Sequence, residues 1–154
     1  MQSALLITES LPLADPLAEW RWKIGGAARI LALSRSGDAF VMQPNGRVAW
    51  LDTGAGDLED VAASGADFEH LLEQPDQAAR LLLAPVVEEY VRLHGPFPLG
   101  KCLGFTKLPV LGGSYSIENR WLAPAVEHFG LTGQLHWQLK DLTEGTNVRI
   151  DIVP

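Results

Sequence analysis

The string Asp52-Thr53-Gly54 is the part of this sequence whose residue types most suggest catalysis. An aspartate held in a glycine loop can activate water when a second carboxylate shares its proton. The second aspartate would have to come from another copy of the chain, across a two-fold axis. The alternative is a turn at the end of a strand, where aspartate and glycine are favoured.

The same string resembles the active-site loop of retroviral-type aspartic proteases. Val110-Leu111-Gly112 is similar to their downstream apolar-apolar-glycine element. This resemblance implies a hydrolase, but Trp50 and Gly56 fit the flanking pattern poorly, and residues 64–94 favour helices where such a protease has strands. We therefore expect a turn at Asp52-Thr53-Gly54 and keep a retropepsin-like protease as an alternative.

Other nucleophiles and metal ligands are sparse. Gly112-Gly113-Ser114 lacks the second glycine of a serine-hydrolase elbow and predicts a tight turn. Cys102 is the only cysteine and stands in an apolar setting, so we expect it to be buried. The sequence has four histidines, namely His70, His94, His128 and His136. None of them has an i, i+4 partner of the kind that helical zinc sites use. We expect no catalytic residue, no metal and no cofactor.

Negative charge is concentrated in the middle of the chain. The net charge is −7, yet residues 52–89 carry ten acidic residues and only one basic residue, Arg80. An acidic surface repels phosphates, so we expect no nucleic-acid binding and predict attraction to a basic protein. The alternative is a solvated helical face that keeps the protein soluble. The candidate partner-binding residues are Asp57, Glu59, Asp60, Glu69 and Glu73.

The bulk composition is typical of one soluble domain. The chain has 154 residues, of which 47% are hydrophobic and 20% are charged. No apolar run approaches the roughly 20 residues of a membrane helix, so we expect no membrane association. The first residues lack the basic start of a secretory signal, and a single cysteine fits a reducing compartment. We predict one cytoplasmic domain over residues 1–154, with its oligomeric state open.

The first half of the chain predicts a short helix followed by a β-meander. Asp15 and Pro16 are typical of a helix start, and Gly25-Gly26 of its end. Asn45-Gly46 between apolar runs indicates a hairpin, and Ser36-Gly37-Asp38 a turn. The expected elements are a helix within 13–22 and strands over 28–34, 40–43 and 47–51.

The middle of the chain changes to a helical period. Residues 64–73 place Phe68 on an apolar face, and a second helical segment runs from a cap at Asp76 to residue 94. Pro85 within it implies a kink or two abutting helices. Thr132 predicts the start of a last helix, although residues 135–139 also suit a strand, and residues 146–153 alternate as a final strand. The layout predicts an α+β domain with a mainly antiparallel sheet and helices packed on one side.

Glycines and apolar blocks alternate from Gly95 onward in a recognisable pattern. Its parts are Gly104-Phe105, Leu108-Pro109, Leu111-Gly112-Gly113, Tyr115-Ser116, Glu118-Asn119, Gly133-Gln134 and Asp141-Leu142 with Gly145 to Val148. The pattern resembles the C-terminal domain of the type VI secretion DNase-immunity family, which is related to the broad SUKH class of immunity proteins. The resemblance covers about residues 95–153.

This resemblance implies a SUKH-like single domain that binds and neutralises a cognate nuclease toxin and has no catalytic residues. It also implies a structural role for Gly112, Gly113, Glu118 and Asn119, which would shape a turn and hold a loop by side-chain to backbone hydrogen bonds. The acidic middle is consistent with it, because a nuclease that grips DNA has a basic cleft. The alternative is a regulatory or interaction module of the same fold with no toxin partner.

Overall fold

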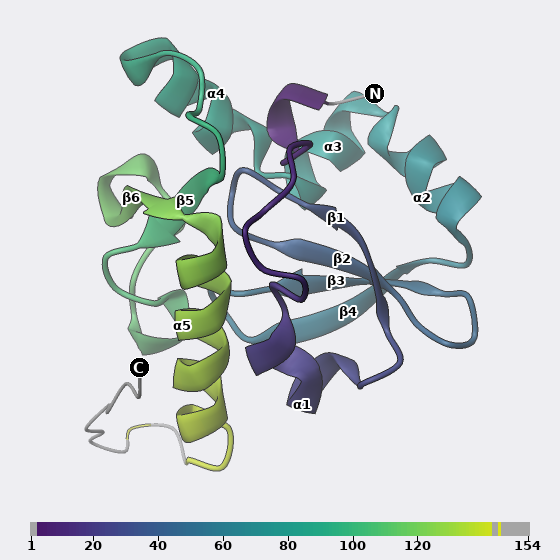
Figure 1. Cartoon of the computed structure of the whole chain (residues 1–154). Coiled ribbons are helices and arrows are strands. Elements are labelled where there is room, and N and C mark those ends of the chain that lie inside the picture. Colours follow the sequence, from purple (N-terminus) through teal and green to yellow (C-terminus); the bar gives the residue numbers. More distant parts are fainter. Residues whose placement is uncertain (1–2, 143–144, 146–154) are drawn as a thin grey trace.

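Four antiparallel strands in chain order form the main sheet (Figure 1). The computed structural model describes residues 3–142 and 145. The strands are β1 (Arg29–Leu33), β2 (Ala39–Met42), β3 (Val48–Asp52) and β4 (Asp57–Ala62). Asn45-Gly46 joins β2 to β3 as predicted, and Gly46 has a positive φ of 85°. The meander is confirmed, and β4 extends it by one strand that the sequence pattern did not indicate.

A second, two-stranded sheet pairs β5 (Lys101–Phe105) with β6 (Arg120–Pro124). The remaining elements are helical. The α-helices are α1 (Arg21–Ile24), α2 (Gly65–Leu72), α3 (Pro75–Leu81), α4 (Ala84–His94) and α5 (Ala125–Leu139). The 3₁₀ helices are η1 (Ser3–Leu5), η2 (Ala18–Trp20), η3 (Pro109–Leu111) and η4 (Ile117–Asn119). The expected α+β class is confirmed.

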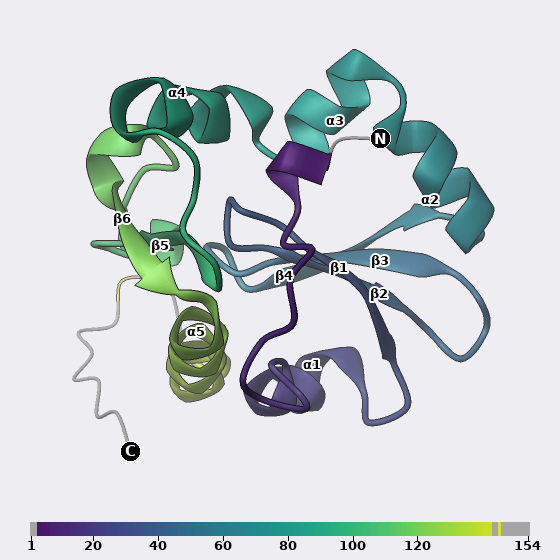
Figure 2. The same ribbon diagram turned by 45° about the horizontal axis from the view of Figure 1, so that its top comes forward.

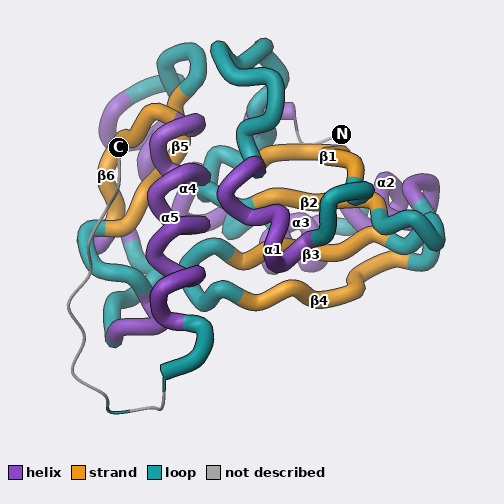
Figure 3. Tube along the Cα trace, turned by 60° about the horizontal axis from the view of Figure 1, so that its bottom comes forward, coloured by secondary structure: helices purple, strands orange, loops and turns teal. Residues whose placement is uncertain are grey.

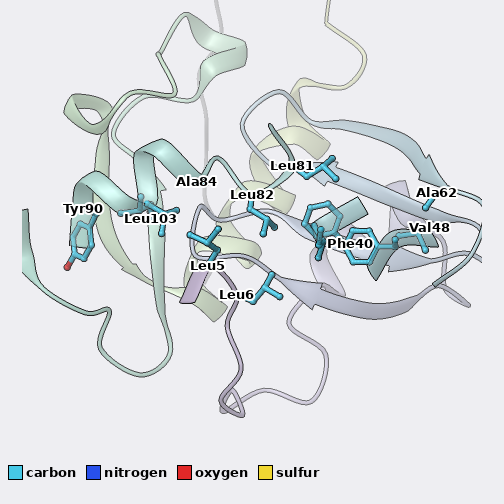
Figure 4. Close-up of a cluster of buried hydrophobic side chains, with 13 residues drawn as sticks. Leu5, Leu6, Phe40, Val48, Ala62, Leu81, Leu82, Ala84, Tyr90 and Leu103 are labelled. Carbon is cyan, nitrogen blue, oxygen red and sulfur yellow. The ribbon is translucent and has the colours of Figure 1, made fainter. Parts of the chain in front are cut away.

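The main sheet buries both of its faces. Phe40 and Val48 join the core formed with α2, α3 and α4, part of which Figure 4 shows. Val41 and Leu51 point to the opposite face, where they pack with residues of η2, α1 and α5. Figure 2 shows α2, α3 and α4 on one side of the sheet and α1 and α5 on the other. The expectation of helices on one side is therefore too narrow, because β2 and β3 are apolar at successive positions and need cover on both faces.

Several helix boundaries follow local signals. The Ser64 side chain accepts a hydrogen bond from the Asp67 backbone N–H and caps α2, which confirms the helix predicted over 64–73. Pro85 lies in the first turn of α4, so the two abutting helices expected there are α3 and α4, joined through Leu83 at a φ of 47°. The predicted cap at Asp76 is wrong: α3 begins at Pro75, which suits a first helical position.

The two terminal helical predictions need correction. The first helix begins later than expected, as η2 and α1 over residues 18–24, and Asp15 instead accepts the Leu17 N–H and pairs with Arg21. The last helix, α5, begins at Ala125, well before Thr132, and excludes the strand over 135–139. The strand predicted over 146–153 lies outside the described residues.

Helix α5 is the element that joins the two sheets. It contacts η2 on one side and β5 and β6 on the other. Figure 3 shows α5 between α1 and the second sheet. A Cβ at Gly133 would lie 2.6 Å from the carbonyl oxygen of Glu19, so this glycine permits the close approach to η2. Within the described part of the chain, no helix has the length and apolar character needed to cross a membrane.

Candidate partner-binding site

Three of the five candidate acidic residues lie on β4, an outer strand of the main sheet. Asp57, Glu59 and Asp60 are exposed. Asp60 pairs with Arg47 at 3.2 Å and Glu59 with Arg80 at 3.5 Å. Asp57 forms no ion pair with any described residue. The two ion pairs are half-exposed and contribute little to stability, so the carboxylates stay accessible to a partner.

Of the other two candidates, Glu69 lies on α2 and Glu73 directly follows its last residue. Glu69 lines a cavity of about 290 Å³ with Leu31 and Ala32 of β1, the opposite outer strand of the sheet. Glu73 lies 3.7 Å from His70 on the exposed side of the same helix. The five residues therefore form two acidic areas and not one helical face, because the segment from 57 to 62 is a strand.

The loop between β5 and β6 is held by one asparagine. The Asn119 amide donates to the carbonyl oxygens of Lys107 (2.7 Å) and Ser114 (2.6 Å), and its Oδ1 accepts the Lys107 N–H at 3.0 Å. Gly113 lies against the same carbonyl, since a Cβ there would come within 1.9 Å of the Lys107 oxygen. Gly112 ends η3 with a φ of 100°. Residues with a side chain therefore do not fit at these two glycine positions unless the loop backbone moves.

Glu118 takes no part in this hydrogen-bond set. It is exposed on η4, where bonds from its own backbone N–H and from Ser116 lower its pKa.

Replacing Asn119 with alanine removes all three hydrogen bonds, so we expect the free energy of unfolding to fall by about 2 kcal/mol. Asn119→Asp keeps the acceptor but places a carboxylate against two carbonyl oxygens. The aspartate variant is therefore expected to be no more stable than the alanine variant. Urea unfolding at pH 7 measures both, and an aspartate variant of wild-type stability would contradict this account of the loop.

This loop forms one wall of an apolar groove, and α5 forms the other. The groove has a volume of about 370 Å³. Phe105, Leu108 and Leu111 line it from the loop side, and Leu131 and Leu135 line it from α5. The remaining lining residues are Thr106, Lys107, Trp121, His128 and Thr132. It is larger than the cavity of about 290 Å³ beside α2 and the cavity of about 270 Å³ beside Arg120, which makes it a candidate binding site.

Asp52 occupies a turn at the end of β3. Its Oδ1 accepts the backbone N–H groups of Gly54 (3.0 Å) and Ala55 (3.2 Å), and the Tyr115 hydroxyl donates to its Oδ2 at 2.9 Å. Burial and the Asp52 charge raise the pKa of Tyr115. The Asp52 carboxylate therefore organises the β3–β4 turn and the loop that carries Tyr115, in agreement with the predicted turn.

A buried carboxylate that the sequence did not single out lies next to this turn. Asp38 is 1% exposed and accepts hydrogen bonds from the Thr53 N–H and the Trp50 Nε1–H, each at 3.0 Å. Burial, together with the nearby Asp52 charge, raises its pKa. The predicted turn at Ser36-Gly37-Asp38 is present, with the Gly37 N–H donating to Ser34. Its position in the interior has no signal in the local sequence.

Two histidines of α5 fasten this helix to the turns of the main sheet. The His128 Nε2–H donates to the Gly37 carbonyl at 2.8 Å, and the His136 Nε2–H donates to the Thr53 carbonyl at 2.8 Å. Burial lowers the pKa of His128 to about 4 and also lowers the pKa of His136. Both rings therefore act as neutral structural donors. Cys102 is buried as predicted, and burial raises its pKa to about 12.

Arg120 is a buried cation of β6. Its guanidinium stacks on Phe105 at 4.0 Å and donates through Nη2 to the carbonyls of Ser36 and Leu103. Its Nε and Nη1 are buried and have no hydrogen-bond partner among the described residues. Arg120 thus links the second sheet to the β1–β2 turn. The described residues hold no cluster of His, Cys, Asp and Glu that could bind a metal ion.

Comparison with known proteins gives a family match for a segment that includes the residues of the groove. No curated protein and no solved structure matches the chain. Residues 62–136 match the family model of the C-terminal domain of the type VI secretion system (T6SS) immunity protein Tdi1. This segment runs from the last residue of β4 into α5 and shares residues 95–136 with the portion expected from the sequence. Residues 62–136 are therefore similar to the C-terminal domain of the T6SS immunity protein Tdi1, which confirms the predicted resemblance to this family.

Proposed function

We propose that this protein binds and neutralises a toxin of a type VI secretion system in the cytoplasm of the cell that makes it. The match to a family of T6SS immunity proteins supports this proposal. The matched segment includes α2 to α4, both strands of the second sheet and most of α5. The protein acts by binding alone, with no cofactor and no catalytic step. The polar residues inside the molecule support a binding role, since Asp38, Asp52, His128 and Arg120 are engaged in holding turns, strands and α5 together.

The toxin is a basic protein, and a nuclease fits best. A nuclease that grips DNA carries Lys and Arg in its cleft, and an acidic surface can occupy that cleft and compete with the phosphates. The exposed carboxylates of β4 are the observation that carries this proposal. They are presented on a strand at the border of the sheet, where a partner can reach them. The acids of α2 form a second acidic area, and the two areas can be tested separately.

Charge reversal tests which acidic area contacts the toxin. The variants are Asp57→Lys with Glu59→Lys on β4, and Glu69→Lys with Glu73→Lys on α2. We expect the area in contact to lose at least tenfold in toxin affinity and to show a smaller salt dependence of binding. The melting temperature should stay unchanged, because these side chains are exposed. Calorimetry at two salt concentrations gives both quantities, with any toxin candidate that the neighbouring genes encode as the partner.

Glu19→Lys is the matched control, because Glu19 is exposed on η2 and belongs to neither acidic area. It should change the affinity less than twofold. Unchanged binding by both double variants would remove the acidic surface from the proposal. An interaction module with no toxin partner is the second candidate, and it predicts no binding of the neighbouring toxin by the wild-type protein.

A further inference from the structure

The apolar groove between α5 and the β5–β6 loop is a second recognition feature, different in chemistry from the acidic areas. We call it the anchor groove, and its lining residues are those given above from Phe105 to Leu135. His128, Leu131, Thr132 and Leu135 recur along α5 at intervals of three and four residues, so one helix face forms a whole wall. The groove therefore runs along the helix and can take an extended apolar group.

The opposite wall is held in place before any partner arrives. Asn119 fixes the backbone at Lys107, and Gly113 packs against the carbonyl of that residue. Leu108 accepts the N–H groups of Leu111 and Gly113, which sets the direction of η3. A binding surface that is already ordered loses little conformational entropy when it is occupied. The Gly112-Gly113 and Asn119 positions thus shape the anchor groove.

The charge of the lining residues indicates which kind of group fits the anchor groove. Among the described residues, Lys107 is the only charged one that lines the groove. It is exposed, and its Nζ forms no ion pair with the described residues. An apolar group with a carboxylate beside it would place the carboxylate on Lys107 and the apolar part among the leucines. This chemistry is opposite to that of β4, which attracts cations.

The rim carries the side chains that dominate protein interfaces. Trp121 lines the groove and is 44% exposed, and Val110 beside Leu111 is 48% exposed. Exposed tryptophan next to an apolar pocket is typical of interface hot spots. Both lie within the family-matched segment, whereas most of β4 precedes it.

We propose that the toxin inserts an apolar anchor side chain, flanked by a carboxylate, into the anchor groove, where Lys107 pairs with the carboxylate. This inference rests on the proposed immunity function and specifies how the toxin is held. The acidic areas speed and orient the encounter, while the anchor groove sets the lifetime of the complex. Groove variants should therefore mainly raise the dissociation rate, whereas variants of the acidic areas mainly lower the association rate.

The test uses the full chain, the toxin identified by the binding experiment above and anilinonaphthalene sulfonate, a fluorescent probe that combines apolar rings with an anion. Leu135→Arg fills the groove and Lys107→Glu reverses its charge. Each is expected to weaken probe binding and toxin binding at least tenfold. Leu93→Arg on α4 and Lys23→Glu on α1 are the controls, because both side chains lie outside the groove, and they should behave as wild type. Lys107 is exposed, so Lys107→Glu keeps the test valid even if Leu135→Arg destabilises the fold.

The outcomes separate the two proposals. Displacement of the probe by the toxin, together with faster dissociation of the groove variants, supports the inference. Toxin binding that is unchanged in both groove variants overturns the anchor groove and leaves the immunity function standing. Failure of the wild-type protein to bind the toxin overturns the immunity function itself. Concentration-dependent dimerisation that Lys107→Glu abolishes overturns the inference in favour of a second copy as the occupant.

Discussion

Replacing Gly37 with alanine is expected to lower the free energy of unfolding by about 3–5 kcal/mol, a large part of the stability of one domain. Gly37 has a φ of 96°, a conformation that costs other residues about 1–3 kcal/mol. A Cβ there would also lie 2.6 Å from the Leu103 carbonyl oxygen and 2.7 Å from the His128 ring. Overpacking of this kind adds about 1–3 kcal/mol, because β5 and α5 would both have to move.

Gly46→Ala is the matched control for this prediction. Gly46 has a similar φ of 85°, but nothing lies within 4 Å of a Cβ placed on it. It should show the backbone cost alone, about 1–2 kcal/mol. Gly26→Ala, with open space and no positive φ, should be close to neutral. If urea unfolding gave Gly37→Ala the same loss as Gly46→Ala, the β1–β2 turn would not be enclosed by β5 and α5 as described.

Gly37 also illustrates which parts of the fold could be predicted from the sequence. Its turn was predictable, because glycine between polar residues is a local signal. The hairpin at Asn45-Gly46 and the cap of α2 at Ser64 were predictable for the same reason. The turn is buried by Leu103 of β5 and His128 of α5, which are far away in the sequence, so no local signal reveals its burial. Local chemistry therefore gave the elements, and the contacts between them came only with the structure.

The missed strands have identifiable causes. Strand β4 is exposed along one edge, so charged residues interrupt the alternation that reveals a strand. Strands β5 and β6 are joined by a long loop with two short helical turns, so no hairpin signal connects them. The start of α5 was missed because Thr132 looks like a cap, whereas its hydroxyl donates to the His128 carbonyl inside the helix.

The candidate site was predictable only in part. The acidic residues were visible as a charge excess, but their division between β4 and α2 depends on the order of strands in the sheet. The anchor groove is formed by residues from three segments, near Phe105, Trp121 and Leu131, and none of these segments shows it alone. The family pattern located the loop that builds the groove, because its glycines and Asn119 are the residues that fix the wall.

When the pH is lowered from 7 to 4, the free energy of unfolding of the wild-type protein should fall by about 3 kcal/mol more than that of the His128→Gln variant. Burial lowers the pKa of His128 to about 4 from its ordinary 6.5, so the native protein keeps the ring neutral. Below pH 6.5 the unfolded chain binds a proton that the native chain does not. The wild-type protein therefore loses stability as the pH falls, until the native ring is also protonated near pH 4. Glutamine can donate the same hydrogen bond to the Gly37 carbonyl but does not titrate.

Comparing the wild-type protein with the His128→Gln variant separates the titration of His128 from that of the other buried groups. Asp38 acts in the opposite direction: its raised pKa makes the native chain bind a proton before the unfolded chain does, which favours the native state as the pH falls below the raised pKa. His136 acts in the same direction as His128, because its pKa is also lowered. The wild-type profile alone mixes these contributions, whereas the difference between wild type and His128→Gln cancels those of Asp38 and His136.

At pH 7 the glutamine variant is expected to be the less stable protein, because it loses ring contacts with Phe105 and Phe129. At pH 4 the gap should close or reverse. Urea unfolding at half-unit steps of pH, with the m-value held as a check on two-state behaviour, gives the difference directly. A gap that stays constant from pH 7 to pH 4 would mean that the native protein protonates this ring as readily as the unfolded chain does. The contact between α5 and the β1–β2 turn would then have to be open to water.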